Sequence, residues 1–364
     1  MNYNDLIYKE SFSFEDIKYL LTQNSIEETE NLRDFAYSVM KQNCSEKVYL
    51  RGLIEFSNYC INDCLYCGIR KSNSSVDRYL LSKDEILDIA LWCAEQGYGS
   101  VVLQSGERSD KEFTDFVTDV VKEIKQASIS EKLPNGLGIT LCVGEQTYEI
   151  YKEFFEAGAH RYLLRIETSK PELFSKIHPD YQNYERRLDC LGYLKDIGFQ
   201  VGTGVMIGIP GQTIDDLAND ILFFKKMNVD MIGMGPFIPH SQTPYFELED
   251  YYKLNKESIF KQALKMIAVT RIVLKDVNIA STTALQAMYP MGREAGLKYG
   301  ANIIMSLLTP TEVRKQYQLY DGKPCMDEFS SDCFDCIQRR IESTGRTVAL
   351  DEYGDSRHYK NKSL

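Results

Sequence analysis

Three cysteines stand close together in one short stretch of the chain. Cys60, Cys64 and Cys67 lie in the segment 59–70, directly after the apolar run 48–56. Three thiolates at this spacing can bind one metal centre. A structural zinc site normally has four protein ligands, whereas a four-iron cluster held by three cysteines leaves one iron open to another ligand. The spacing therefore favours a metal centre at which chemistry can occur.

A second cysteine group stands nearer the end of the sequence, at Cys325, Cys333 and Cys336. Clustered cysteines in a reducing compartment indicate metal or redox chemistry instead of disulfides. We expect an auxiliary iron-sulfur cluster here; zinc with Asp332 or Asp335 as fourth ligand, or a trio of unoccupied thiols, are the alternatives. Small buried hydrophobic residues account for the remaining cysteines, which are Cys44, Cys93, Cys142 and Cys190.

The elements that must position these residues repeat one pattern. From Val48 onward, a short apolar run, a polar or glycine-bearing loop and an amphipathic helix alternate. Strands that alternate with helices predict parallel pairing through right-handed crossovers. Eight such units predict an α/β fold with a complete (β/α)8 TIM barrel, and an open doubly wound sheet is the alternative. The predicted strands are 48–56, 100–104, 137–143, 161–166, 200–207, 231–238, 278–282 and 301–307.

Helix signals divide the chain into three parts. Apolar residues at helical spacing predict helices over 14–21 and 29–40, within an N-terminal helical cap of residues 1–47. The barrel spans 48–309, and residues 310–364 form a C-terminal extension that carries the second cysteine group. Capping boxes predict helix starts inside the barrel at Ser82 with Glu85, Ser169 with Glu172, and Thr213 with Asp216.

Composition excludes several classes of protein. With 364 residues, 43% hydrophobic and 26% charged, the chain has the composition of a globular protein. Its formal net charge of -11, without a Lys/Arg stripe, argues against nucleic acid as a partner. We expect no membrane span and no secretory signal, and therefore a cytoplasmic location.

The first cysteine group, with Tyr66 before its last member, resembles the cluster motif of the radical S-adenosylmethionine (SAM) superfamily. This resemblance implies a [4Fe-4S] cluster whose open iron binds SAM, and reductive cleavage of SAM to a 5'-deoxyadenosyl radical. A SAM site needs donors for a carboxylate and acceptors for a ribose and an amine. Glu167 can accept from the ribose or amine, and Arg187 can reach the carboxylate. Elsewhere these two residues would be read as a surface ion pair.

A glycine-rich stretch, 204–211, follows the fifth predicted strand. Its glycines lack the spacing of a dinucleotide fingerprint, and the stretch lacks the lysine of a P-loop. Close approach of its backbone to an adenine is the functional interpretation, which places Gly208 among the expected cofactor contacts.

Further motifs are similar to those of the HydE family of [FeFe]-hydrogenase maturases, a relative of the biotin synthase and methylornithine synthase group. The similarity extends from about residue 48 to residue 336. The motifs that carry it are 54–58, 60–67, 103–107, 161–165, 211–216, 235–240 and 317–320. The resemblance implies a small organometallic substrate, an iron carbonyl cyanide bearing cysteine, together with a reductase or ferredoxin-type electron donor and other hydrogenase maturases as partners.

The same resemblance extends the expected site. SAM contacts are expected from Tyr66, Glu107, Glu167, Arg187 and Gly208. Substrate contacts are expected from Gln104, Ser105, Arg161, Arg165, Thr282, Thr283, Tyr317 and Tyr320. Two arginines and two threonines inside a closed barrel would be costly to bury without an anionic partner. The alternative is that one arginine points outward or pairs with Glu107.

One position departs from the family pattern. Ile166 stands between Arg165 and Glu167, where many relatives carry a histidine. The role of an imidazole near SAM is therefore open, and the hypothesis of a related enzyme with another substrate becomes stronger. The competing hypotheses are a radical SAM mutase of the methylornithine synthase type and a non-catalytic iron-sulfur carrier. A carrier would need a fourth cysteine near the triad, and none stands between Cys67 and Cys93.

Overall fold

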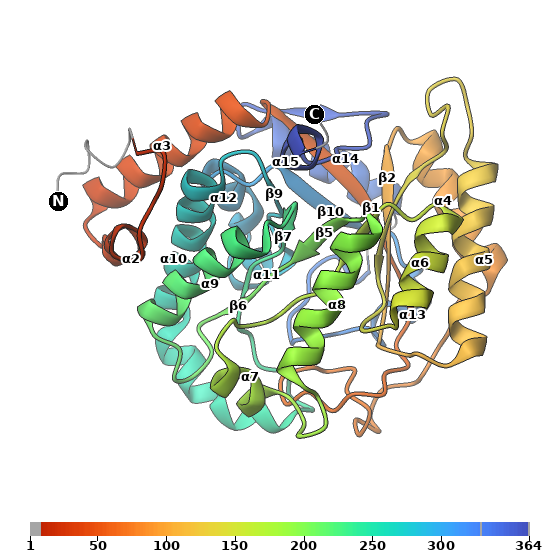
Figure 1. The fold of residues 1–364 in the computed structure, drawn as a ribbon, viewed down its shortest axis with the longest axis horizontal. Coiled ribbons are helices and arrows are strands. Elements are labelled where there is room, and N and C mark those ends of the chain that lie inside the picture. Colours follow the sequence, from red (N-terminus) through yellow and green to blue (C-terminus); the bar gives the residue numbers. More distant parts are fainter. Residues whose placement is uncertain (1–8, 328–329, 363–364) are drawn as a thin grey trace.

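A path of eight parallel strands, surrounded by helices, organises the fold (Figure 1). The computed structural model of the protein describes residues 9–327 and 330–362, with side chains described from 334 onward in the second range. The spatial order is β10-β1-β2-β3-β4-β5-β7-β9. These strands are β1 (Lys47–Ser57), β2 (Ser100–Ser105), β3 (Gly138–Cys142), β4 (Arg161–Leu163), β5 (Gln200–Thr203), β7 (Met231–Ile232), β9 (Asn278–Ile279) and β10 (Ile303–Leu307).

Each strand falls within one of the eight predicted runs or extends it slightly, so the predicted α/β alternation is confirmed. Two runs are divided, however. The run 200–207 holds β5 and β6 (Met206–Ile207), and the run 231–238 holds β7 and β8 (Gly235–Pro236). Gly204 lies at the break, where a Cβ atom would be 1.9 Å from the Gly233 carbonyl oxygen. Beyond this close approach β6 and β8 pair with each other as a separate two-stranded sheet.

The two ends of the strand path lie next to each other. Ala280, just after β9, forms an isolated parallel bridge with Ile303 of β10. The Ser281 amide donates to the Ile303 carbonyl at 2.9 Å, and the Asn302 amide donates to the Ile279 carbonyl at 2.9 Å. Backbone hydrogen bonds therefore connect the first and last strands of the path.

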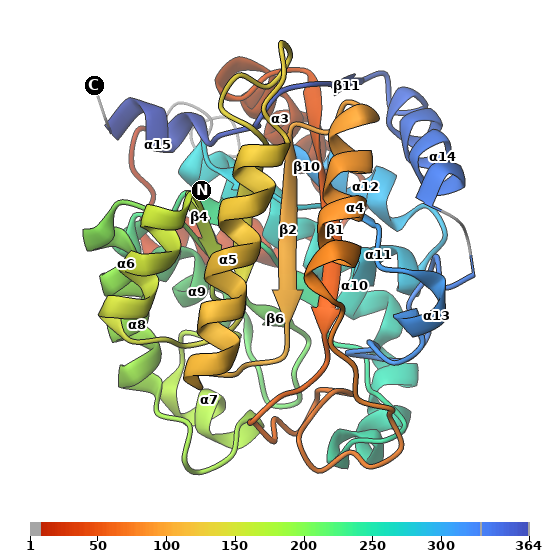
Figure 2. The ribbon, with the colours of Figure 1, turned by 90° about the vertical axis from the view of Figure 1, so that its right-hand side faces the viewer.

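Most helices lie outside the strands (Figures 1 and 2). They are α4 (Lys83–Glu95), α5 (Lys111–Ala127), α6 (Tyr148–Ala157), α7 (Pro171–Ile177), α8 (Tyr184–Ile197), α9 (Ile214–Met227), α10 (Glu249–Leu274), α11 (Thr283–Met288), α12 (Gly292–Lys298) and α13 (Thr311–Arg314), with a 3-10 turn, η1 (Pro244–Leu248). The predicted capping boxes at Ser82 and Thr213 are confirmed. The one at Ser169 is wrong, because its hydroxyl and amide donate to Asp220 at 2.6 and 2.7 Å.

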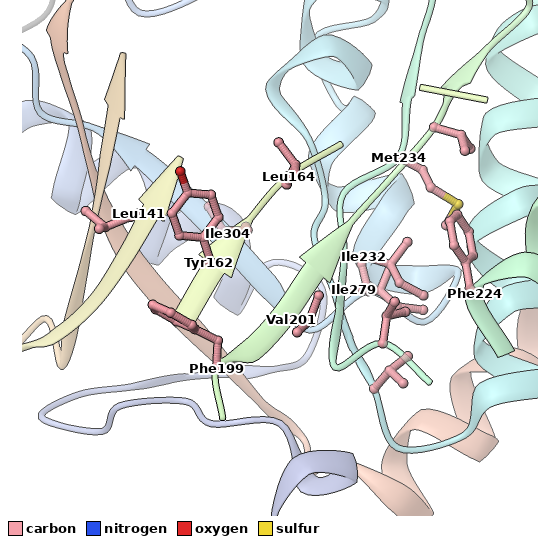
Figure 3. Packing of buried hydrophobic residues seen from close by; sticks show 14 of the residues in the cluster. Leu141, Tyr162, Leu164, Phe199, Val201, Phe224, Ile232, Met234, Ile279 and Ile304 are labelled. Atoms are coloured by element: carbon pink, nitrogen blue, oxygen red, sulfur yellow. The ribbon is translucent and has the colours of Figure 1, made fainter. Parts of the chain in front are cut away.

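Successive side chains along a strand face alternately the hydrophobic core and an interior cavity. In β2, Val101 and Leu103 belong to the main hydrophobic cluster, Val102 belongs to a small inner cluster, and Gln104 lines the cavity. Figure 3 shows part of the main cluster, with strand residues such as Leu141 and Tyr162 on one side and Phe224 of helix α9 beside Met234 on the other. This period of two fixes which side chains can reach a ligand inside the sheet.

The two ends of the chain pack on this central unit. Helices α2 (Phe14–Thr22) and α3 (Ile26–Asn43) contact α9 and α10, as Figure 1 shows for the N-terminal segment. The later part contains α14 (Ser330–Glu342), β11 (Thr347–Ala349) and α15 (Arg357–Lys362). Strand β11 pairs in parallel with β1 and was not predicted, because three residues give no readable periodicity. Within residues 9–327 and 330–362, no helix has the length and apolar character that a membrane span requires.

Candidate functional site

A cavity of about 340 Å³ lies at the C-terminal ends of the strands. In Figure 2, β1 and β2 point toward this end of the molecule, and the long loop after β1 lies there. The predicted residues that line the cavity are Cys60, Cys64, Cys67, Tyr66, Gln104, Ser105, Glu107, Arg165, Glu167, Arg187, Thr282, Thr283, Tyr317 and Tyr320. Residues from most strands of the path therefore meet in one space, as the sequence predicted.

The loop that carries the three cysteines is fixed from within. The Arg78 guanidinium donates to the carbonyl oxygens of Asn58 and Arg70, both at 2.6 Å, and of Ile69 at 2.9 Å. The Asn58 side chain accepts from the Tyr79 amide at 2.8 Å, so the start and end of the loop are joined. These bonds give a long irregular segment one defined backbone path without a helix or strand.

The three thiols face the cavity as neutral groups. Burial raises the pKa of Cys60 and Cys64, and it raises the pKa of Cys67 to about 12. A zinc ion draws sulfur ligands to about 2.3 Å, which demands closely spaced sulfurs. No three Cys, His, Asp or Glu side chains among the described residues are gathered tightly enough to hold one metal ion. A metal centre bound by the three cysteines would have to displace the thiol protons.

Arg187 is held beside the cavity by two carboxylates. Its Nε donates to Glu145 Oε1, and its Nη2 lies 4.0 Å from Glu107 Oε2. Although burial opposes its charge, Glu145 and Glu107 raise the pKa of Arg187. Burial also raises the pKa of Glu107. Glu145 therefore belongs to the site, although its position on the chain gave no signal beyond its place after the third strand.

Glu167 lies in the loop after β4 with a left-handed backbone. Its φ is +62°, an uncommon conformation for a residue with a side chain. Its amide donates to the Gly204 carbonyl, and its carbonyl accepts from the Met206 amide at 2.9 Å. The carboxylate accepts from Arg165 Nη2 at 2.8 Å. Strain of this kind, fixed by hydrogen bonds on both sides, is typical of functional positions.

The deeper wall carries donors and hydroxyls. Gln104 donates to the Tyr317 hydroxyl at 3.2 Å, and Arg293 Nη2 donates to the Thr283 hydroxyl at 2.7 Å. The Thr282 hydroxyl and Arg165 Nε are buried without a hydrogen-bond partner among the described residues. Unpaired polar atoms at a cavity wall indicate a polar or anionic ligand, because burial without a partner is costly. Arg293 was missed by sequence reasoning, since it comes from helix α12.

A buried ion pair closes another side of the cavity. Lys323 Nζ donates to both carboxylate oxygens of Glu55, at 2.5 and 2.6 Å, and to the Tyr317 carbonyl at 2.9 Å. The side chains are only 7% and 3% exposed. The pair ties the segment that bears Tyr317 and Tyr320 to the end of β1. Sequence reasoning could not have found this pair, because 268 residues separate its members.

Two predicted site residues do not reach the cavity. Arg161 is the first residue of β4, so it lies at the opposite end of the strand, where its guanidinium binds Asp355 at 2.8 Å and the Tyr353 carbonyl at 2.9 Å. Its predicted substrate contact is therefore wrong. Gly208 is not among the described cavity-lining residues, and its amide donates to Gln212. The predicted cofactor contact of Gly208 is likewise not supported.

An imidazole does line the cavity, although position 166 lacks one. Ile166 is buried in the main cluster, whereas His178 lies beside Tyr66. His178 Nδ1 lies 2.9 Å from the Phe174 carbonyl and must therefore carry the proton, so Nε2 accepts from the Tyr66 hydroxyl at 3.2 Å. Burial lowers the pKa of His178 to about 3. The histidine is thus a neutral group that orients Tyr66.

The second cysteine group is only partly described. Cys325 has a left-handed backbone, with φ +64°, and its carbonyl accepts from Arg314 at 2.9 Å. Cys336 lies on α14 as a free thiol. The side chain of Cys333 lies outside the described part of the chain, so the predicted auxiliary cluster stays a prediction.

Comparison with known proteins adds three relationships. The family model described as the radical SAM superfamily matches residues 54–224. The [FeFe] hydrogenase maturase subunit HydE of Thermotoga maritima is 42% identical over 352 residues, which are 97% of this chain and 96% of that protein. The 3-methylornithine synthase of Methanosarcina acetivorans is 27% identical over 93% of this chain and 90% of that protein.

Solved structures agree on the fold. Methylornithine synthase (PylB) superposes with a TM-score of 0.80 at 25% identity and covers 96% of this chain and 97% of its own. HydG, a maturase of the [FeFe]-hydrogenase, has a TM-score of 0.75 at 20% identity over 94% of this chain and 74% of its own.

Proposed function

The chain belongs to the radical SAM superfamily, and from this membership we propose that it is a HydE-type maturase of the [FeFe]-hydrogenase. In this proposal it cleaves SAM reductively to a 5'-deoxyadenosyl radical, which acts on a cysteine-bearing iron carbonyl cyanide precursor of the H-cluster. One observation carries the proposal: the three thiols line the same cavity as Arg165, Glu167 and Thr282. A radical formed at the thiols would therefore be enclosed with whatever binds at the deeper wall.

The residues present fit the two cofactors that membership implies, a [4Fe-4S] cluster and SAM. Cys60, Cys64 and Cys67 would hold the cluster, because they supply three sulfur ligands that line one cavity. The cluster supplies the electron that breaks the sulfonium bond. Glu167 and Arg187 would hold SAM, as acceptor and donor for its polar groups.

Side chains of the protein would position SAM and the substrate and would enclose them in the cavity. Arg187 stays charged between Glu145 and Glu107, so it presents a fixed positive charge to a carboxylate. Tyr66, oriented by His178, offers a flat ring at the cavity wall. Thr282 and Arg165 line the cavity, and each has one buried polar atom without a hydrogen-bond partner among the described residues, which supports a polar or anionic substrate at this wall. The apolar remainder of the wall limits water, which protects a reactive intermediate.

The hydrogen bonds between the ends of the strand path support a complete (β/α)8 barrel, with residues 1–47 as a helical cap, 48–309 as the barrel and 310–364 as a cysteine-bearing extension. Cys325, Cys333 and Cys336 would hold an auxiliary cluster.

The free thiols suit a reducing compartment such as the cytoplasm. A ferredoxin-type donor or a reductase would supply the electron, and other maturases would supply and accept the substrate.

The test is anaerobic reconstitution with iron and sulfide, followed by reduction in the presence of SAM. We expect 5'-deoxyadenosine from the wild type and none from Cys64→Ala, whereas Cys190→Ala, a buried cysteine outside the cavity, should retain it. Conversion of a cysteine-bearing iron complex would then support the substrate. Zinc binding without SAM cleavage by the wild type would contradict the proposal.

A second function is kept because of the similarity to methylornithine synthase over nearly the full length of both chains. Such a mutase would use the same radical on an amino acid. Incubation with lysine distinguishes the two, since conversion of lysine to an isomer would favour the mutase.

A further inference from the structure

Helix α9 carries a buried carboxylate outside the cavity. Asp220 is 0% exposed and is not among the described residues that line the cavity. Its Oδ1 accepts from the Ser169 hydroxyl at 2.6 Å and from the Ser169 amide at 2.7 Å. Its Oδ2 is buried without a hydrogen-bond partner in the described part of the chain. The bonds of this carboxylate are therefore directed at one residue, Ser169.

The link between Asp220 and Ser169 is costly on both sides. Burial raises the pKa of Asp220 to about 7, and only the bonds from Ser169 oppose this effect. On the other side, the Ser169 hydroxyl does not cap helix α7, whose N-cap residue, Lys170, makes no side-chain capping bond. Departures from local preference of this kind concentrate at functional sites.

Ser169 lies in a segment that carries or orients two expected SAM contacts. Two residues before it stands Glu167, with its left-handed backbone at φ +62°. Helix α7 begins two residues after it, and His178 at the end of α7 orients Tyr66. The Ser169 carbonyl also accepts from the Tyr184 hydroxyl at 2.8 Å. A shift of Ser169 would therefore move both the Glu167 carboxylate and the support of the Tyr66 ring.

The unusual backbone of Glu167 needs an anchor on each side. Its own amide and carbonyl bond to Gly204 and Met206, which precede α9 in the chain. The two bonds from Ser169 to Asp220 attach the following residues to α9 itself. A residue in a sparsely populated conformation keeps it only when the surrounding structure fixes it. Asp220 supplies the anchor on the C-terminal side of Glu167.

We propose that Asp220 is a positioning residue for SAM binding, which acts through Ser169 to fix the turn at Glu167 and the start of helix α7. The inference rests on the proposed function, in which Glu167 and Tyr66 contact SAM. Asp220 itself touches neither SAM nor the substrate. It acts through hydrogen bonds, as a second layer of groups that holds the binding groups in place.

Calorimetry with SAM tests the proposal on reconstituted, unreduced protein, in which SAM is bound but not cleaved. Asp220→Leu has no acceptor for Ser169, and we expect it to raise the Kd of SAM about tenfold, because small displacements of a binding group by remote substitutions are costly. Asp220→Asn keeps an oxygen at the Oδ1 position and should bind SAM as the wild type does.

Asp230→Leu is the matched control. Asp230 is 2% exposed and also accepts two bonds, from the Val201 amide and from Lys362, both at 2.9 Å. It stands directly before β7, at the end of the strands opposite the cavity. Removal of this carboxylate should lower the thermal midpoint and leave the Kd of SAM unchanged.

A double-mutant cycle shows whether Asp220 acts through Ser169. Ser169→Ala removes the hydroxyl bond and should raise the Kd of SAM by less than Asp220→Leu does, since the amide bond remains. Ser169→Thr keeps a hydroxyl and should restore binding. Ser169→Ala added to Asp220→Leu should raise the Kd no further, because residues that act on one link are not additive.

Reduction with dithionite separates this inference from the proposed function. If the wild type forms no 5'-deoxyadenosine, the proposed function fails. If it does, but Asp220→Leu binds SAM with the wild-type Kd, or Asp230→Leu weakens binding as much, the positioning role is overturned. If Asp220→Leu does not fold, Ser169→Ala is compared with Ser169→Thr, and equal Kd values for these two variants would overturn the role.

Discussion

Replacing Lys323 with methionine should destabilise the protein by about 3–5 kcal/mol, the usual cost of removing one member of a buried ion pair. Methionine fills similar space but offers no charge, so the Glu55 carboxylate would lose both bonds from Lys323 and keep its contact with the Thr309 hydroxyl at 3.4 Å. Burial raises the pKa of Glu55, with Lys323 acting in the opposite direction. Without the lysine, the raised pKa makes the folded state favour the neutral carboxyl group. The loss should therefore be smaller at pH 5 than at pH 8.

Urea unfolding at the two pH values measures this effect. Glu55→Gln combined with Lys323→Met should be more stable than Lys323→Met alone, because no unpaired charge is then buried. Lys83→Met removes an exposed pair with Glu123, in which both side chains are 40% exposed, and should cost at most about 1 kcal/mol. A cost below about 1 kcal/mol for Lys323→Met, or a double variant less stable than the single one, would refute the reasoning.

Three further outcomes are expected. Arg187→Met should weaken SAM binding about 10-fold to 100-fold by calorimetry, because it removes a charge-assisted bond worth about 1.5–3 kcal/mol, whereas unchanged affinity would place SAM elsewhere. The yield of assembled cluster at limiting iron should increase from pH 7 to pH 9, because the thiols must lose their protons to bind iron and burial raises the pKa of Cys67 to about 12. Absorbance of the assembled cluster measures this yield, and a yield that does not depend on pH would contradict the prediction. Burial raises the pKa of Asp220 from 3.8 to about 7, so the folded state favours the neutral carboxyl group, and the stability that this group contributes is lost as pH rises from about 4 to about 7. Asp220→Asn cannot ionise, so its thermal midpoint should change less between pH 5 and pH 8 than that of the wild type. Equal changes in the two proteins would exclude Asp220 as the cause.

The strands were predictable because buried parallel strands are continuous apolar runs between polar loops. Their division at Gly204 was not, since it depends on the approach of Gly233 from another strand. Ser169 shows the same limit. Its sequence context matches a capping box, yet its hydroxyl binds Asp220, 51 residues away.

The site was predictable where spacing carried the chemistry, as at Cys60, Cys64 and Cys67. It was not predictable where position along a strand decided the role. Arg161 and Arg165 are separated by four residues, or about 13 Å in an extended strand, and only Arg165 reaches the cavity. Glu145 and His178 gave no motif, because each acts through a partner that the fold brings to it.

Strand β1 depends on the far end of the chain for two of its polar groups. Glu55 is neutralised by Lys323, and Arg51 Nη2 donates to the Gly354 carbonyl at 3.3 Å. During synthesis, a carboxylate and a guanidinium near residue 50 must therefore stay hydrated for about 300 further residues, until both partners have left the ribosome. Strand β1 is synthesised first, yet its polar groups are among the last to find their partners. A nascent chain that stalls before residue 323 would expose an incomplete sheet to chaperones and proteases.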